Sequence, residues 1–404
     1  MGFTFGHIAD IHLGNYQGKV EAGGFNSRFV DFVKTYNQSI DEMIKAKVDF
    51  CLMVGDIFRS KNPTPEEINE FAKGIMKLQA AGIPIIVTLG NHDLFLADNK
   101  THSIGVIETL LNRHDNFIIS REPEIIKLKL KSEEVQILSF PYPIRSLLRL
   151  ENSKEVEQYV IKKVDELYES RDPNIPIAFA GHFTLRDCVV GDEQRYVDKF
   201  AEPLIPGDIF KGKDFFYGAM GHIHKFQVVY KTPLVIYTGS NNRVDFNEVK
   251  EDKGFCLVRY VDGKTAYKFI KVDARKFVDL KYDLSDEDDP QTYIMDDLKT
   301  RIPEMKDAIV RLGVILSEEN KNKYDVKIIA NFIEEHSYWI HGSCIPSVKK
   351  KNEGRNNAGF TEAMDELQSL NHYAIAHKVK NKKKFIEIGE KIIKLVNGGM
   401  ENDM

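Results

Sequence analysis

Five short apolar segments of this chain end in residue types that bind metal ions in proteins. The segments and the residues after them are Phe3–Ala9 with Asp10 and His12, Phe50–Val54 with Asp56, Pro84–Leu89 with Asn91, His92 and Asp93, Ile177–Ala180 with His182, and Phe215–Met220 with His222 and His224. Short apolar runs that stop at a glycine or a polar cluster predict buried strands. A fold for this chain therefore has to place the ends of five strands where these polar residues can bind metal ions.

The segments between the first three predicted strands have the pattern of helices. Asn26–Val48 carries apolar residues at helical spacing, and Pro65 opens a second helix that stops at Gly82. This alternation predicts an α/β fold with parallel strands and crossover helices. Because ligands of open α/β sheets gather at the carboxyl ends of strands, we expect all five segments to open onto one edge of the sheet.

The later sequence predicts a division into domains. Apolar runs over residues 228–272 predict antiparallel strands, and a domain break is expected near Ala274. A charged stretch over 349–357 has the composition of a linker. The predicted parts are a main domain over 1–274, a small α+β domain over 275–345, a linker over 346–358 and a helical segment over 359–404.

The polar residues at the strand ends suit a pair of metal ions. Residues i and i+2 of an extended backbone point the same way, so we expect Asp10 and His12 to reach one ion together, as can His222 and His224. Mixed Asp, Asn and His ligands favour Mn²⁺, Fe or Zn²⁺ over Ca²⁺. Two ions about 3.5–4 Å apart, bridged by one carboxylate, would use all the ligands and activate water against a phosphoryl group.

Each motif taken alone has an ordinary explanation. An Asp-x-His triplet can be a surface or core pair, and a lone His182 is more often a structural histidine. Gly-Asn-His-Asp after an apolar strand is more specific, and Gly-His-x-His is similar to it. Because all of them follow predicted strands, their joint occurrence predicts a metal site.

Composition excludes several classes of protein. The net charge of −5 excludes a simple basic nucleic-acid binder, although metal ions and a few Lys or Arg can neutralise phosphate locally. Widely spaced cysteines predict free thiols; they are Cys51, Cys188, Cys256 and Cys344. The N-terminal residues lack the basic region of a signal peptide, and no apolar run approaches the roughly 20 residues of a membrane span. We therefore expect a cytoplasmic protein with no membrane partner.

Together the motifs resemble those of the calcineurin-like metallophosphoesterases, and within them the SbcD family of DNA double-strand-break repair nucleases. The segments that carry the resemblance to this branch are Asp10-Ile11-His12-Leu13-Gly14, Gly55-Asp56-Ile57-Phe58 with Pro63, Ser139-Phe140-Pro141-Tyr142, and Gly239-Ser240 with Arg243 and Glu251-Asp252-Lys253-Gly254-Phe255. The resemblance covers residues 1–273 and implies a nuclease domain built as a β-sandwich flanked by helices. Beyond these residues only the layout is similar: a capping domain over 275–345 and partner-binding helices over 359–404.

The resemblance also implies a role for each site residue. The first metal would be held by Asp10, His12, Asp56 and His224, and the second by Asp56, Asn91, His182 and His222. His92 would stabilise or protonate the leaving oxygen, and Asp93 would orient His92. Arg59 departs from relatives that carry a histidine or an acid at this place, and either a phosphate contact or a solvated charge explains it.

The activity implied by the resemblance is metal-dependent hydrolysis of DNA, as an exonuclease or endonuclease, with two Mn²⁺ ions. Its partners would be double-stranded DNA ends, single-stranded DNA and an SbcC-type coiled-coil ABC ATPase, and the family forms homodimers. A small-molecule or RNA phosphodiesterase is the alternative on the same scaffold. A protein Ser/Thr phosphatase fits less well, because that branch has Gly-Asn-His-Glu where this chain has Gly-Asn-His-Asp. A scaffold with a vestigial site is a third hypothesis, against which the intact ligand set argues.

The C-terminal segment combines apolar stripes with a basic cluster. The stripes lie at helical spacing; they are Phe360, Met364, Leu367 and Leu370, then Phe385, Ile388, Ile392 and Leu395. The cluster comprises Lys378, Lys380, Lys382, Lys383 and Lys384. A solvated charge run and a contact with DNA phosphate both explain the lysines. The stripes have too little chain around them for a core of their own, so docking on another protein is expected.

Overall fold

The computed structural model describes residues 2–21, 23–94, 102–111, 116–131, 133–190, 202–349, 374 and 381–398. The chain divides into two compact units. The first contains Met1–Tyr282, Gln291–Val314 and Asp325–Ile345, and the second contains Asp283–Pro290, Ile315–Tyr324 and Pro346–Met404. The candidate site lies entirely in the first unit.

The first unit contains a six-stranded mixed sheet built around the N-terminal strand. Its strands, in spatial order, are β12 (Lys264–Lys271), β11 (Gly254–Val261), β1 (Gly2–Ile8), β2 (Phe50–Val54), β3 (Ile85–Thr88) and β4 (Phe117–Ser120). The strands from β1 to β4 are parallel, whereas β11 pairs antiparallel with β1 and β12. The predicted crossover helices are confirmed as α1 (Ser27–Lys45) and α2 (Pro65–Ala80), which begin at side-chain caps from Asn26 and Thr64.

A second six-stranded sheet faces the first. Its strands, in spatial order, are β5 (Glu124–Lys129), β6 (Glu134–Phe140), β7 (Ile177–His182), β8 (Tyr217–Gly221), β10 (Leu234–Tyr237) and β9 (Gln227–Lys231). The strands from β6 to β10 pair in parallel, and the two edge strands are antiparallel to their neighbours. Aromatic rings from both sheets fill the layer between them, including Phe5, Phe50 and Tyr217.

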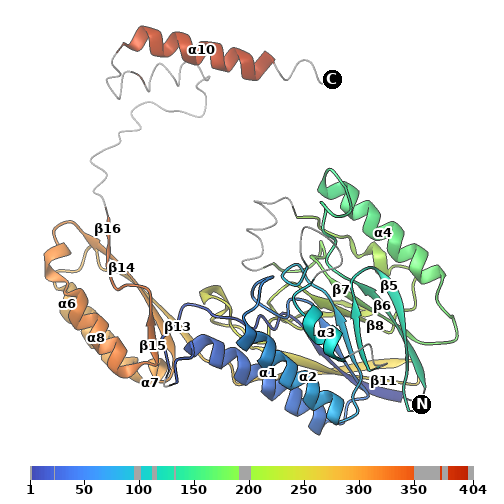
Figure 1. Ribbon diagram of the computed structural model, residues 1–404. Coiled ribbons are helices and arrows are strands. Elements are labelled where there is room, and N and C mark those ends of the chain that lie inside the picture. Colours follow the sequence, from blue (N-terminus) through green and yellow to red (C-terminus); the bar gives the residue numbers. More distant parts are fainter. Residues whose placement is uncertain are drawn as a thin grey trace. The chain divides into compact units, whose positions relative to one another are not determined.

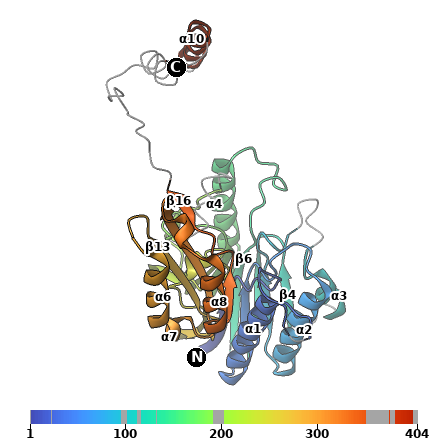
Figure 2. The same ribbon diagram turned by 90° about the vertical axis from the view of Figure 1, so that its left-hand side faces the viewer.

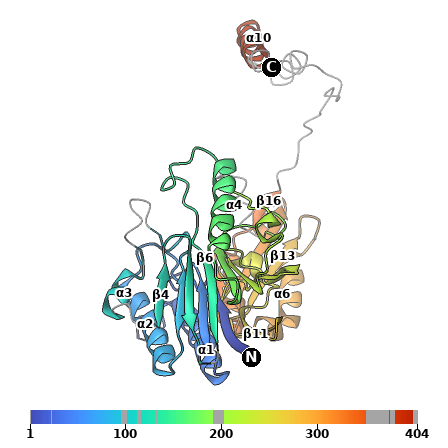
Figure 3. The same ribbon diagram turned by 90° about the vertical axis from the view of Figure 1, so that its right-hand side faces the viewer.

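Helices cover the outer faces of the two sheets. Figure 1 shows α1 and α2 together beside the first sheet, where their apolar faces bury Phe32, Tyr36 and Phe71. Figures 2 and 3 show α4 (Ser153–Glu169) beside β6, where Val156 and Val160 are buried. The short helix α3 (Gly105–Leu111) precedes β4. The result is the predicted β-sandwich flanked by helices.

The remaining elements follow the sandwich in the chain. They are β13 (Phe277–Asp283), α6 (Pro290–Thr300), α7 (Ile302–Met305), β14 (Ile309–Ser317), α8 (Val326–His336), β15 (Trp339–His341), β16 (Ser347–Lys349) and α10 (Lys382–Gly398). Three short 3₁₀ turns lie among the described residues: Gly207–Phe210, Phe246–Glu248 and Lys321–Lys323. A small sheet has the order β13-β14-β15, and β16 pairs with β14.

One prediction about the sheets is wrong. The five segments with metal-binding residues do not belong to one sheet, since β1, β2 and β3 lie in the first sheet and β7 and β8 in the second. Among the described residues, Cys51, Cys188, Cys256 and Cys344 form no disulfide bond, as predicted. Within the described ranges, no helix is both long and apolar enough to span a membrane.

Candidate metal centre

The predicted metal ligands gather where five strand ends of the two facing sheets meet. Asp10 and His12 follow β1, Asp56 follows β2 and Asn91 follows β3. His182 ends β7, and His222 and His224 follow β8. All but Asn91 and His224 are buried. The site is therefore formed by the sandwich as a whole.

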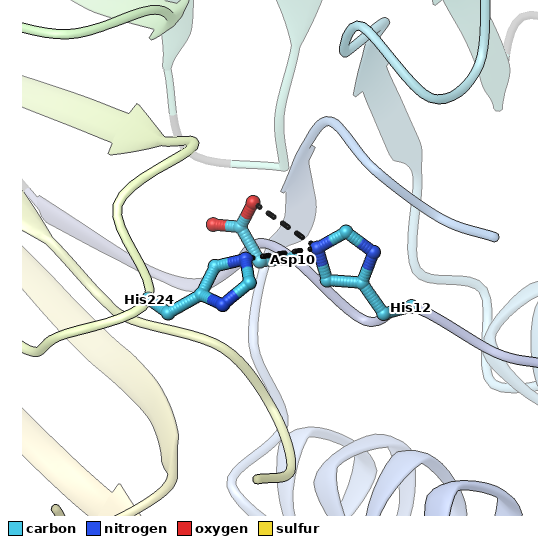
Figure 4. Close-up of side chains that lie close together, drawn as sticks. All are labelled: Asp10, His12 and His224. Atoms are coloured by element: carbon cyan, nitrogen blue, oxygen red, sulfur yellow. Dashed lines mark hydrogen bonds and ion pairs between the residues drawn. The ribbon is translucent and has the colours of Figure 1, made fainter. Parts of the chain in front are cut away.

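One group of ligands consists of Asp10, His12 and His224, whose side chains point toward one another in Figure 4. The Nε2 atoms of His12 and His224 are 3.0 Å apart, and His12 Nε2 is 4.0 Å from Asp10 Oδ1. His224 Nδ1 donates its proton to the Glu248 carboxylate, so the lone pair of His224 Nε2 is turned toward His12 and Asp10. The group is thus suited to hold a positive ion.

A second group consists of Asp56, His182 and His222, with Asn91 beside them. Asp56 Oδ2 is 3.4 Å from His182 Nε2. The Asn91 side-chain oxygen lies 3.3 Å from His182 Nε2 and 3.1 Å from His222 Nδ1. Asp56 Oδ2 is also 3.7 Å from His12 Nε2 of the first group. Asp56 therefore lies between the two groups, where a bridging carboxylate is needed.

The backbone at these ligands is not extended, so the premise of the i, i+2 prediction is wrong. The φ angles of Asp10, His12, Asp56 and His222 are 49°, 50°, 52° and 93°, in the left-handed region that such residues seldom adopt. Asp10 and His12 still share one group. His222 and His224 lie in different groups, because the chain turns sharply at His222.

Backbone hydrogen bonds hold these turns in place. The amide of Asp10 donates to the carbonyl of Gly55, and the amide of His222 donates to Asp10 Oδ2 at 2.9 Å. Two glycines permit the close approach of the loops. A Cβ at Gly221 would lie 2.0 Å from the carbonyl oxygen of Val54, and one at Gly90 would lie 2.2 Å from Asp56 Oδ1. Any other residue at these two positions would push the ligand loops apart.

Two glutamates that contact the ligand histidines were missed in the sequence. His224 Nδ1 lies 2.9 Å from Glu248 Oε1, and Lys253 Nζ lies 2.8 Å from the other oxygen of Glu248. His222 Nε2 lies 2.7 Å from Glu202 Oε1. Glu248 is separated from His224 by 24 residues of loop and sheet, so no local pattern indicates the contact. The only signal near it was the resemblance of the segment from Gly239 to Phe255.

The side chains at the centre compensate one another electrostatically. Burial raises the pKa of Asp10. Burial also opposes ionisation of Asp56, yet His182, His92 and His12 hold the pKa of Asp56 well below its ordinary value. Burial would lower the pKa of His182, but Asp56 raises it to about 9. Asp56 and His182 therefore share a buried ion pair, and a metal ion binding here would displace the histidine proton.

His92 lies beside the centre with its side chain 37% exposed. Its Nε2 is 3.9 Å from Asp56 Oδ2, and its Nδ1 is 2.7 Å from the carbonyl oxygen of Arg59. The expectation that Asp93 orients the His92 ring is wrong. The Asp93 carboxylate instead accepts hydrogen bonds from the backbone N–H groups of Asp56, Ile57 and Gly90. The Arg59 carbonyl takes the orienting role.

A pocket of about 760 Å³ opens onto the centre. His12, Asp56, Asn91, His92, His222 and His224 line it. Cationic and aromatic side chains line it as well: Arg59, Lys61, Arg145, Tyr16 and Tyr142. Burial lowers the pKa of Lys61, and the charge of Asp56 partly offsets this shift. The ammonium therefore lies within electrostatic reach of the centre. Mixed carboxylate, amide and imidazole donors in two groups fit a pair of divalent ions.

The predicted metal ligands lie within the part of the chain that matches a protein-family model. The family model of the calcineurin-like phosphoesterases matches residues 3–226. The chain is similar to the DNA double-strand break repair protein Mre11 of Methanopyrus kandleri, being 25% identical over 278 residues, 66% of this chain and 56% of that protein. It is 24% identical to the SbcD component of the nuclease SbcCD of Escherichia coli K12 over 272 residues, 64% of this chain and 65% of that protein.

A third relative is the uncharacterized metallophosphoesterase YhaO of Bacillus subtilis, 28% identical over 278 residues, 66% of this chain and 59% of that protein. The chain thus spans between 56% and 65% of the length of these three relatives. The family model covers more than half of the 404 residues and includes every strand end that carries a ligand. The chain belongs to the calcineurin-like phosphoesterase family.

Proposed function

We propose that this protein is a metal-dependent nuclease that hydrolyses phosphodiester bonds at DNA ends in double-strand break repair. The observation that carries the proposal is one pocket that joins two groups of metal ligands to the cations Arg59, Lys61 and Arg145. A polynucleotide brings several phosphates to a site, and cations beside the ligands neutralise those that flank the bond being cut. The repair and nuclease functions in the names of the Mre11 and SbcCD relatives support the same substrate.

In this proposal one ion is held by Asp10, His12, Asp56 and His224, and the second by Asp56, Asn91, His182 and His222. When bound, two Mn²⁺ ions supply an activated water and offset charge on the phosphate. His92 has a partly exposed ring and faces the pocket, so it donates a proton to the leaving oxygen. Glu248 and Glu202 fix the orientation of the ligand imidazoles that they contact.

The first experiment measures cleavage of end-labelled linear duplex and single-stranded DNA with Mn²⁺ and with a chelator. Hydrolysis of bis-nitrophenyl phosphate, a small phosphodiester, is measured in parallel. We expect shortening of DNA that requires Mn²⁺ and stops with the chelator. Turnover of the small phosphodiester without any DNA cleavage, with or without an ATPase partner, would instead favour the small-molecule alternative. Loss of both activities with both ions bound would favour the vestigial scaffold.

We further propose that residues 359–404 bind the coiled-coil base of an SbcC-type ABC ATPase, with 275–345 as a capping domain and 346–358 as a linker. Among the described residues of this segment, α10 begins with the exposed Lys382, Lys383 and Lys384. Ile388 on the same helix is 51% exposed, as a docking face requires. The first stripe, over 360–370, and Lys378 and Lys380 lie outside the described residues.

The partner proposal is tested by deleting residues 360–404 and measuring binding to the purified ATPase by light scattering. We expect binding to be lost while Mn²⁺-dependent cleavage by the remaining chain persists. A triple change of Lys382, Lys383 and Lys384 to Gln serves as the comparison, because it removes charge and keeps the apolar face. An ATPase complex that survives the deletion would rule out this role for the segment.

We also propose a homodimer formed through the first helices. Exposed apolar side chains on α2 and α3 support this proposal: Met76 is 62% exposed, Val106 58% and Leu110 77%. Large apolar side chains exposed on helices would be removed from water in such an association surface. Light scattering should give twice the chain mass for the wild type and the chain mass for Leu110→Glu. A monomeric wild type would exclude the dimer.

A further inference from the structure

Arg59 lies beside the metal centre, where its backbone carbonyl contacts His92 and its side chain lines the pocket. It follows the ligand Asp56 by three residues, and its carbonyl oxygen lies 2.7 Å from His92 Nδ1. Its side chain is exposed and lines the pocket that opens onto the ligands. The chain therefore places a permanently charged group on the loop that orients His92.

Two contacts hold the guanidinium of Arg59 in place. It lies over the ring of Tyr16, with 4.4 Å from its carbon to the ring centroid, and donates a hydrogen bond to the carbonyl of Asn15. Tyr16 in turn stacks on the buried Phe32 with ring centroids 4.6 Å apart. The Tyr16 ring is thereby fixed against α1, which carries Phe32.

A second set of contacts fixes the segment that carries this platform. The Asn15 side chain donates to Glu67 Oε1 at 3.0 Å, and Glu67 closes the capping box of α2 with Thr64. A Cβ at Gly14 would lie 2.5 Å from Arg59 Cβ, so the two loops touch at this point. The arginine side chain thus loses little further freedom when it binds a ligand.

The charge of Arg59 is not neutralised by the neighbouring protein. Arginine has five N–H donors, and one of them serves Asn15. Within the part of the chain that the structure describes, no carboxylate forms an ion pair with Arg59. A fixed guanidinium with free donors in a pocket lined by candidate metal ligands is typical of an anion contact. A solvated surface charge would not need such anchoring.

We propose that Arg59 is a substrate-binding residue that contacts the DNA phosphate next to the scissile one, on the side of the leaving oxygen. The inference rests on the proposed nuclease function and names one subsite of it. The side is assigned because the same residue orients His92, the group that protonates the leaving oxygen in that proposal. The scissile phosphate itself belongs to the metal ligands, which lie deeper in the site.

The test combines a protein change with a chemical change in the DNA. Oligonucleotides carry one uncharged methylphosphonate linkage, placed on either side of the linkage that is cut, and mass spectrometry of the products identifies the leaving side. The proteins are wild type, Arg59→Gln, Arg59→Lys and Lys127→Gln. Lys127 is exposed on β5 and lines no part of the pocket, so its variant matches the charge change of Arg59→Gln. Bound Mn²⁺ is counted in every variant.

We expect the methylphosphonate on the leaving side to lower kcat/KM of the wild type by about 10- to 100-fold, the usual size of a charge-assisted contact. The same replacement should lower kcat/KM of Arg59→Gln by about twofold or less, since this variant already lacks the guanidinium that would contact the phosphate. Arg59→Lys should lie between the two, because lysine keeps the charge but not the fork of donors. Lys127→Gln should match the wild type, and all variants should bind equal Mn²⁺.

Four results would overturn the inference. Equal losses in wild type and Arg59→Gln would show that the arginine does not meet this phosphate. A loss for Arg59→Gln that is as large on bis-nitrophenyl phosphate as on DNA would place the contact at the scissile phosphate. If the loss in kcat/KM depends on Arg59 only when the methylphosphonate lies on the opposite side of the cut, the assignment of the side is reversed. A wild type that cuts no DNA but hydrolyses the small ester would refute the nuclease proposal itself, and the inference with it.

Discussion

Asp93 holds three loops of the site together with one carboxylate. It accepts hydrogen bonds from the amides of Asp56, Ile57 and Gly90, at 2.8, 3.0 and 2.9 Å, and from the hydroxyl of Ser103. An ionised carboxylate accepts at both oxygens, whereas an asparagine side chain presents donors on one of its two sides. The strand ends that carry Asp56 and Asn91 therefore depend on this one residue.

We predict that Asp93→Asn lowers the free energy of unfolding by about 1–3 kcal/mol, because at least one buried amide loses its acceptor. Urea denaturation of the metal-free protein measures the change. Asp41→Asn is the matched control, since Asp41 is 59% exposed and pairs with Lys77 at the surface. An unfolding free energy equal to that of the control would show that the carboxylate does not hold the loops.

His7 makes stability depend on pH. It is fully buried in β1, its Nδ1 lies 2.9 Å from the Tyr217 hydroxyl, and burial lowers its pKa to about 3. The unfolded chain takes up this proton below about pH 6.5 and the folded chain does not. The contribution of His7 is therefore complete above about pH 6.5 and is lost as the pH falls from there toward 3.

We predict that His7→Gln makes the unfolding free energy less dependent on pH between about 6 and 4. Glutamine does not titrate and still offers a polar group to Tyr217. The slope should become smaller by up to about 1.4 kcal/mol per pH unit, the value of one proton. Chemical denaturation at several pH values measures both slopes. Parallel curves for the two proteins would contradict the prediction.

The packing of α1 against α2 depends on the absence of a side chain at Gly74. A Cβ there would lie 2.3 Å from the hydroxyl of Tyr36, which is buried and donates to the carbonyl of Phe71. Glycine inside a helix costs about 1 kcal/mol relative to alanine, so propensity alone would favour alanine. The close contact between the helices explains why glycine is present.

We predict that Gly74→Ala destabilises the protein by about 1 kcal/mol or more, because overpacking outweighs the gain in helix propensity. Gly105→Ala is the comparison, since the nearest atom to a Cβ at Gly105 is 3.8 Å away in His102. That change should be neutral or stabilising. Thermal unfolding of both variants measures the difference, and a stabilised Gly74→Ala would mean that the two helices can separate without loss.

Most elements were predictable from local patterns, whereas their arrangement in sheets was not. The run Phe50–Val54 coincides with β2, and the predicted start at Pro65 and stop at Gly82 closely bound α2. Apolar periodicity and caps act within a few residues, so they are visible in the sequence. The pairing of β11 with β1 joins segments from opposite ends of the sandwich sequence, such as Phe5 with Val258, and no local pattern specifies it.

At the scale of the whole molecule, the metal centre joins the two sheets. Asp10, Asp56 and Asn91 come from the first sheet, and His182 and His222 come from the second. Ions held between them bind the folded chain and not the separated sheets. Metal binding should therefore stabilise the entire sandwich rather than one loop.

We predict that Mn²⁺ at about 100 times its dissociation constant adds about 2.7 kcal/mol per site to the unfolding free energy and raises Tm, and that a chelator reverses the change. Asp56→Ala should bind at least one ion fewer and show a smaller increase, because Asp56 lies between both groups. Calorimetry with metal counting measures both. Two tightly bound ions in Asp56→Ala would contradict the bridging position.

The chemistry of the centre could be recognised from the chain alone, because ligand types are fixed by residue identity and strand ends by local apolar runs. Local spacing could not show which ligands lie together, because the turn at His222 separates it from His224 and two sheets supply each group. Glu202, Glu248 and the platform under Arg59 became visible only in the folded chain. Their contacts join segments brought together by burial of the sandwich core, and such contacts leave no periodic trace in the sequence.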